Sequence, residues 1–150
     1  SLVNVVLTKL GIRGFPKTSG GSGIQVFIPL APGHTYPEVR EFCGAVGALL
    51  RSAYPEKVTM EASKAKRAGK VYVDVDQNAK GQTLVAPYSV RPYPGAPVSA
   101  PLEWTELDQD LVPEQFTIRT IFERLEEVGD PFKPALSLKQ DLHPALEQLR

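Results

Sequence analysis

The sequence predicts a mixed α/β (α+β) fold, and three observations support this prediction. Segments with the two-residue period of strands alternate along the chain with segments of helical period. Of the 150 residues, 42% are apolar and 23% are charged, as in ordinary globular proteins. A chain of this length is also long enough to bury a substantial core.

Helices and strands alternate in the first third of the chain. Apolar spacing predicts a short helix over residues 2–11, followed by a polar, glycine-rich loop over 15–23. The β-branched and aromatic run over 24–30 predicts a strand that Pro29 closes. A capping-box spacing and one apolar stripe then predict a helix over 35–54.

The sequence over residues 58–88 predicts short secondary-structure elements. Residues 58–60 suggest a brief strand, and the basic stretch within 61–70 suggests a short helix. The alternating run over 71–76 predicts a strand, and a turn at 78–81 makes residues 83–88 its expected hairpin partner.

The last third is less regular. A proline-rich loop is expected over residues 91–101, and short helices are expected near 104–107 and 116–127, followed by a polar tail. Asp108 and Asp110 fall in a helix-end context, where a cap or loop role is expected.

The charge balance and the cysteine content limit the partners and the cellular compartment that the sequence predicts. Seventeen basic residues balance seventeen acidic ones, so no overall field draws the chain to nucleic acid or membrane. The single cysteine, Cys43, excludes an internal disulfide and favours a reducing, cytoplasmic setting. No apolar run approaches the length of a membrane span, so no membrane contact is expected. The apolar start directly at Ser1 suggests a fragment or a processed product.

Two acidic residues share one face of the expected strand over 71–76. Valines alternate with Asp74 and Asp76, so the two carboxylates point the same way. Such a pair can bind a divalent cation, lie exposed at an edge, or accept backbone N–H groups where a turn begins. The third interpretation suits Asp76, which precedes Gln77.

Three basic or glycine-rich features could bind phosphate. The loop over 17–23 offers backbone N–H groups, hydroxyls and a lysine, although glycine-rich loops before strands are commonly simple turns. The basic stretch over 64–70 is either a solvated helix face or a phosphate contact. Arg91 is either a surface loop residue or a bidentate phosphate ligand.

The histidines and the cysteine form no recognisable catalytic or metal-binding motif in the sequence. His34, His143 and Cys43 are expected in a loop, the tail and the core, respectively. Two histidines and one cysteine make a zinc site improbable on sequence grounds. No Ser-His-Asp or Cys-His catalytic pattern is recognisable either.

Four motifs in this order resemble the polymerase domain of bacterial DNA ligase D, in the archaeo-eukaryotic primase superfamily. They are residues 15–26, 64–74, 85–91 and 94–104, and the segments 116–120 and 129–132 are also similar to the closing region of that domain. The resemblance implies a primase-polymerase palm with an RRM-like sheet, incomplete in this chain.

The resemblance also implies a domain organisation. Residues 1–150 are expected to be the C-terminal half of such a domain. They would comprise a phosphate-loop motif over 15–30, a third catalytic aspartate motif over 64–91 and closing helices over 102–150. The Asp-x-Asp pair that supplies the first two metal ligands of the family is expected before Ser1, so the fragment alone is expected to be inactive.

The implied activity is a metal-dependent nucleotidyltransferase that adds NTPs or dNTPs at DNA ends in non-homologous end joining. Two Mn²⁺ or Mg²⁺ ions would act with Asp74 as catalytic and metal-binding residue. Asp76 corresponds to a position that is not required to be acidic in this family. The residues implied to bind the nucleotide are Ser19, Gly20, Gly21, Ser22, Gln25, Arg67, Gln77 and Arg91.

Two positions depart from the family pattern. The family usually has histidine at Gln25, and glutamine can still donate to a phosphate without a titratable charge. A lysine often stands where this chain has Ser22, which would weaken or rearrange a triphosphate contact.

The resemblance implies partners and leaves two other functions open. The implied partners are DNA ends, the N-terminal half of the same domain, an ATP-dependent ligase domain and Ku, at the bacterial nucleoid. A nucleotide- or DNA-binding remnant without turnover is one alternative. A structural domain that docks on a ligase is the other.

Overall fold

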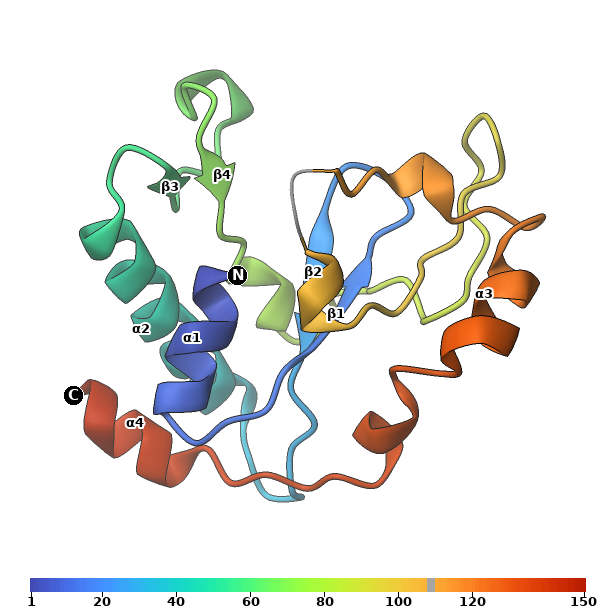
Figure 1. The fold of residues 1–150 in the computed structure, drawn as a ribbon. Coiled ribbons are helices and arrows are strands. Elements are labelled where there is room, and N and C mark those ends of the chain that lie inside the picture. The colour runs from blue at the N-terminus through green and yellow to red at the C-terminus, as the bar shows by residue number, and fades with distance from the viewer. Residues whose placement is uncertain (108–109) are drawn as a thin grey trace. The chain divides into compact units, whose positions relative to one another are not determined.

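The computed structural model describes residues 1–107 and 110–150. Its contacts group the chain into two compact units, and each is built from separated segments (Figure 1). Unit 1 contains Ser1 and residues 13–30 and 85–140, and unit 2 contains residues 2–12, 31–84 and 141–150. The helix-end role expected for Asp108 lies outside the described residues.

Unit 1 is organised around an antiparallel hairpin. Strand β1 (Phe15–Thr18) pairs with β2 (Ile24–Phe27), so that Phe15 lies opposite Phe27 and Thr18 opposite Ile24. The strand expected over 24–30 is therefore confirmed over its first four residues. The loop expected to begin at Phe15 begins only at Ser19, and this expectation was wrong.

A second segment explains why β1 forms despite its proline. The backbone near Pro101 bridges β1 on the side away from β2, where Thr18 N donates to Ala100 O at 2.9 Å. Pro16 has no N–H to donate, but its carbonyl accepts from Leu102 N at 2.9 Å. All four residues of β1 are buried as a result.

Unit 1 contains a cluster of buried apolar residues that includes part of this segment. The cluster consists of Val98, Ala100, Leu102, Phe116 and Ile121. Helix α3 (Ile121–Val128) begins at the last of these and ends at Gly129. Short 3₁₀ helices over Trp104–Glu106, Pro113–Gln115 and Lys133–Leu136 complete the unit.

Unit 2 contains three α-helices: α1 (Leu2–Lys9), α2 (Tyr36–Ala53) and α4 (His143–Leu149). The Thr35 hydroxyl accepts from Glu38 N, and the Glu38 carboxylate accepts from Thr35 N, so the predicted capping box is confirmed. Helix α4 was missed because its segment was taken for a polar tail, although Ala145 and Leu146 are buried.

The strand region of unit 2 differs from the predicted hairpin. Strand β4 covers only Val71–Tyr72 and pairs in parallel with β3 (Val58–Thr59). A 3₁₀ helix over Lys64–Lys66 lies between them in the sequence. The six-residue strand and its partner over 83–88 were therefore wrong, because only two residues of β3 are available for pairing.

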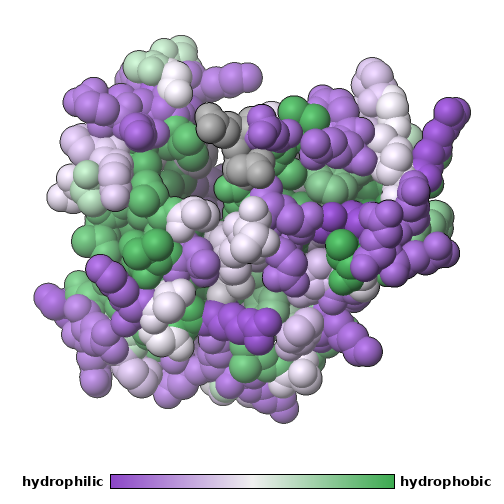
Figure 2. Space-filling view, in the orientation of Figure 1, coloured by the Kyte–Doolittle hydropathy of each residue, from purple (hydrophilic) through white to green (hydrophobic). Residues whose placement is uncertain are grey.

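Apolar side chains also reach the surface of unit 2. Leu2 and Val5 of α1 and Leu49 of α2 are exposed, and Figure 2 shows apolar surface over these helices. They line a shallow groove together with Leu50 and Tyr54. Within the part of the chain that the structure describes, no helix has the length and apolar character needed to cross a membrane.

Candidate functional site

The loop between β1 and β2 is organised by the side chain of Ser19. Its Oγ accepts hydrogen bonds from Gly21 N and Gly23 N, both at 3.2 Å, and Ser19 N donates to Gly23 O at 2.8 Å. Among the described residues, the amides of Gly20 and Ser22 have no hydrogen-bond acceptor. Two N–H groups of this loop can therefore donate to a bound anion.

Arg91 lies directly against this loop. Gly20 has a φ of +70°, and a Cβ at this position would overlap Arg91 Cγ. The backbone of Arg91 is held by a hydrogen bond from its N–H to Pro97 O at 2.8 Å. The guanidinium lies 5.7 Å from the ring centre of Tyr93. The fold thus brings Arg91 to the glycine-rich loop.

Lys17 is a fully buried cation beside the same loop. Its Nζ donates to Gln25 Oε1 at 2.7 Å and to Ser99 Oγ. Burial, together with the nearby charge of Arg91, lowers the pKa of Lys17 to about 8. Among the residues described, neither cation forms an ion pair with a carboxylate. The region has an excess of positive charge.

Lys17 also fixes the orientation of Gln25. A lysine ammonium can only donate, so the carboxamide oxygen of Gln25 must face Lys17. The carboxamide NH₂ then faces the other way and can donate to a ligand. The NH₂ group of Gln25 is therefore available as a donor, and its phosphate contact stays a prediction.

Ser99 is the residue of this region that the sequence did not assign to the site, whereas Lys17 was expected only as a lysine of the candidate phosphate loop. Ser99 Oγ donates to Thr18 O at 2.6 Å and accepts from Lys17, so it bridges β1 and the segment after Arg91. The burial of Lys17 was not foreseen, because residues 15–18 were expected in a loop and not in a strand.

Asp74 and Asp76 lie after strand β4 rather than on it. Asp74 is exposed, and its Oδ1 accepts from Asp76 N at 3.0 Å where the 3₁₀ helix Asp76–Asn78 begins. Asp76 Oδ1 pairs with Arg40 Nη2 of α2 at 2.8 Å. The backbone-acceptor role expected for Asp76 was wrong, because Asp74 is the acid that accepts the N–H, and metal binding by Asp74 stays a prediction.

The side chain of Arg67 is fixed by contacts with residues of the same unit. Its guanidinium stacks 3.9 Å from the ring centre of Tyr72, and it donates to Glu61 O at 3.1 Å and Ala62 O at 2.8 Å. Burial raises the pKa of Tyr72, and the charges of Asp74 and Asp76 raise it further. These contacts give Arg67 a structural role, and its phosphate contact stays a prediction.

The candidate residues are divided between the units. Ser19, Gly20, Gly21, Ser22, Gln25 and Arg91 belong to unit 1. Arg67, Asp74 and Gln77 belong to unit 2, where Gln77 is exposed. Unit 1 therefore holds a cationic, amide-rich group, and unit 2 holds an exposed carboxylate.

Comparison with known proteins identifies the family. The model of the LigD primase-polymerase domain matches residues 1–132. The chain belongs to the LigD primase-polymerase domain family. The resemblance inferred from the motifs is thereby confirmed, and so is the mixed helix and strand fold of a primase-polymerase.

The relatives of this LigD domain are large end-joining proteins. The chain is 39% identical over 148 residues to the bifunctional non-homologous end joining protein LigD of Bacillus subtilis. It is 35% identical over 145 residues to the multifunctional LigD of Pseudomonas aeruginosa. These alignments cover 97% and 95% of this chain but only 24% and 17% of the relatives.

A solved structure matches the LigD domain fold. The polymerase domain of Mycobacterium tuberculosis ligase D, in complex with DNA, superposes with a TM-score of 0.83 at 32% identity. The match covers 92% of this chain and 48% of that chain. The chain thus spans about half of the solved polymerase domain and a smaller share of the curated relatives.

Proposed function

We propose that this chain is part of a DNA-repair polymerase that adds NTPs or dNTPs at DNA ends in non-homologous end joining. The observation that carries the proposal is the group formed by Gly20, Gln25 and Arg91 beside Lys17. It combines free donors with positive charge that no carboxylate among the described residues neutralises. A nucleoside triphosphate supplies the missing negative charge.

Each residue of this group has a distinct part in holding the triphosphate. The amides of Gly20 and Ser22 donate to phosphate oxygens, and the oriented NH₂ of Gln25 adds a neutral donor. Arg91 presents a planar guanidinium that suits bidentate phosphate contacts. Lys17 acts through Gln25 and through its charge, since its side chain is fully buried.

The exposed carboxylate of Asp74 fits a divalent metal. Mg²⁺ and Mn²⁺ prefer oxygen ligands from one or two carboxylates, water and substrate phosphates. Asp74 is exposed, and the Asp76 N–H fixes its orientation. The ions would polarise the α-phosphate and activate the primer hydroxyl. Asp74 would be one of the carboxylates that hold them, while the triphosphate donors would hold the leaving pyrophosphate.

One carboxylate cannot hold two ions. Asp76, the acid nearest in sequence, is paired with Arg40. We therefore propose that an Asp-x-Asp motif outside residues 1–150 supplies the other two carboxylates, and that DNA ends are the second substrate. The DNA-bound state of the solved relative supports the DNA partner.

The decisive experiment measures Mn²⁺-dependent nucleotide addition to a DNA end. The assay combines this chain with a polypeptide that carries the Asp-x-Asp half, and compares the wild type with Asp74→Asn. Loss of a metal ligand should lower the rate by at least the ~10–100-fold typical of outer-shell changes. The same variants are tested for triphosphate binding by calorimetry with Mn²⁺.

The outcomes separate the polymerase from its alternatives. Addition that depends on Asp74 supports the polymerase. Triphosphate binding without addition, even with the second half present, would indicate a non-catalytic nucleotide-binding remnant. Absence of both would leave only a structural domain that docks on a ligase. Equal rates for the wild type and Asp74→Asn would remove Asp74 from the proposed site.

A further inference from the structure

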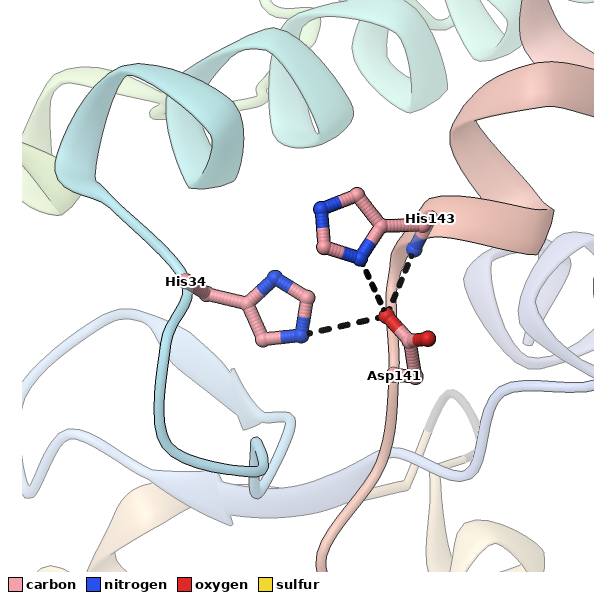
Figure 3. A group of neighbouring side chains, drawn as sticks. All are labelled: His34, Asp141 and His143. Carbon is pink, nitrogen blue, oxygen red and sulfur yellow. Dashed lines mark hydrogen bonds and ion pairs between the residues drawn. The ribbon is translucent and has the colours of Figure 1, made fainter.

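Two histidines that are far apart in the sequence meet in unit 2. His34 lies in the turn before α2, and Asp141 and His143 lie where α4 begins. Figure 3 shows both imidazole rings directed at the same carboxylate. The potential ligand atoms of these three residues all lie within 4.8 Å of one another. The LigD family model ends at residue 132, before Asp141 and His143.

The carboxylate oxygen lies between the two rings. Asp141 Oδ1 is 3.4 Å from His34 Nε2 and 2.6 Å from His143 Nδ1. The ring centres are 4.8 Å apart and the rings are tilted by 31°. A single position near Asp141 Oδ1 is therefore accessible to one nitrogen from each ring (Figure 3).

The two ring nitrogens of His34 lack a complete set of hydrogen-bond partners within residues 1–107 and 110–150. Leu142 N donates to His34 Nε2 at 3.3 Å, so Nε2 carries a lone pair rather than a proton. Asp141 Oδ1 is a second acceptor only 3.4 Å from this nitrogen, with no proton between the two acceptors. Because an imidazole nitrogen has a single lone pair, a cation bound at Nε2 would replace the Leu142 N–H there. The other nitrogen, Nδ1, is buried and has no hydrogen-bond partner among the described residues. The side chain is only 5% exposed, so bulk water does not resolve this conflict.

A cation between Nε2 and the carboxylate resolves the conflict of two facing acceptors. We propose that His34, Asp141 and His143 bind a divalent transition-metal ion of the Zn²⁺ type. The ligand atoms are His34 Nε2, a carboxylate oxygen of Asp141 and His143 Nδ1, and water completes the shell. Two imidazoles favour such an ion over Mg²⁺ or Mn²⁺, which distinguishes this group from the oxygen ligand Asp74.

Two of the separations in the group are close to those around such an ion, and the widest, up to 4.8 Å, would have to close on binding. Zn–N and Zn–O bonds of about 2.0–2.2 Å place tetrahedral ligand atoms roughly 3.3–3.5 Å apart. The separation of 3.4 Å between His34 Nε2 and Asp141 Oδ1 already fits. The separation of 2.6 Å to His143 Nδ1 must open by less than about 1 Å. His143 can make this shift, because its side chain is 56% exposed.

An outer carboxylate orients His143. Its Nε2 lies 3.3 Å from Glu38 Oε1, so it can donate there when Nδ1 binds the metal. Glu38 is itself fixed by Thr35 N at 2.7 Å and Thr35 Oγ1 at 2.8 Å. This is the carboxylate–histidine–metal arrangement of many zinc sites. The bound ion would link the first residues of α2 and α4.

The test measures binding of Zn²⁺ alone to the full chain, in competition with a chromophoric chelator. We expect one ion per chain, and X-ray absorption of the Zn²⁺ complex should show scattering from two imidazoles. His143→Gln and Asp141→Asn should each weaken binding by at least tenfold. Both residues are exposed, so both variants should fold, which circular dichroism checks.

Glu56→Gln is the matched control, because it removes an exposed carboxylate of the same unit that belongs to neither proposed site. It should retain the Zn²⁺ affinity and the two-imidazole signature. Absence of Zn²⁺ binding, or absorption without imidazole scattering, would overturn the proposal. Unchanged affinity in both His143→Gln and Asp141→Asn would show that these residues form only an ion-pair cluster.

Discussion

Arg91 passes across Gly20 so closely that a single added carbon at Gly20 would overlap Arg91 Cγ. The glycine also adopts a φ of +70°, which L side chains rarely adopt. Gly20 is thus required both by its backbone conformation and by the cation packed on it. This relationship fixes Arg91 at the loop that carries the proposed phosphate donors.

Gly20→Ala should therefore reduce both stability and triphosphate affinity. The strained φ and the overlap with Arg91 should lower the free energy of unfolding by roughly 1–3 kcal/mol. Displacement of Arg91 should weaken triphosphate binding, which calorimetry measures. The control is Gly21→Ala, whose Cβ would meet Ser19 Oγ and Tyr93 at ordinary distances of 3.6 Å. Equal losses in the two variants would contradict the assigned contact.

The lowered pKa of Lys17 predicts that the free energy of unfolding depends on pH in the alkaline range. Its pKa is about 8 in the folded chain, against 10.5 for an ordinary lysine. Between these values the unfolded chain binds a proton that the folded chain lacks, so the contribution of Lys17 to stability rises with pH. Below pH 8 both states are protonated, and this contribution is constant.

Urea unfolding of the wild type and Lys17→Met between pH 7 and 10 measures this effect. The wild type should gain stability relative to the variant as pH rises through about 8. Other titrating groups, including Cys43, are common to both proteins and cancel in the difference. Parallel pH profiles would mean that the buried lysine titrates as an exposed one does.

Replacement of Asp76 by Asn should affect nucleotide addition much less than replacement of Asp74 by Asn. Asp76→Asn removes the exposed ion pair with Arg40 but keeps the backbone N–H that Asp74 accepts. We expect a change of less than about 1 kcal/mol in stability, and nucleotide addition close to that of the wild type. Asp74→Asn should abolish addition in the same assay. Comparable losses in both variants would show that Asp76 also acts in the reaction.

Cys43 should react slowly with alkylating reagents. Burial raises the pKa of its thiol to about 11, and the thiolate is the reactive form. At pH 8 the folded chain should react with iodoacetamide at least ~100-fold more slowly than the chain in denaturant. Mass spectrometry of quenched samples measures the rate. Similar rates in both conditions would place the thiol in contact with solvent.

Local signals predicted those parts of the fold that local interactions determine. The capping box at Thr35 and the apolar stripe after it predicted α2, because both depend only on neighbours in the sequence. The alternation after Val71 indicated extended backbone but not its partner. The length and direction of β4 depend on β3, whose two residues pair with it in parallel.

The same distinction holds for the candidate site. The glycine-rich loop and Arg91 were predicted as separate features, and only the pairing of β1 with the segment near Pro101 brings them together. The histidines were assigned to a loop and a tail for the same reason. Nothing in the sequence near His34 indicates that His143 lies beside it.

The alternation of segments between the two units has a consequence for how the chain is synthesised. Unit 2 includes residues 141–150, and unit 1 extends to residue 140. As the ribosome releases the chain from its N-terminus, the first strands and helices emerge long before their partners. Neither core can therefore close until translation of this region is almost finished. Cutting the chain at any one point would also divide at least one core, so neither unit can be produced as a single continuous fragment.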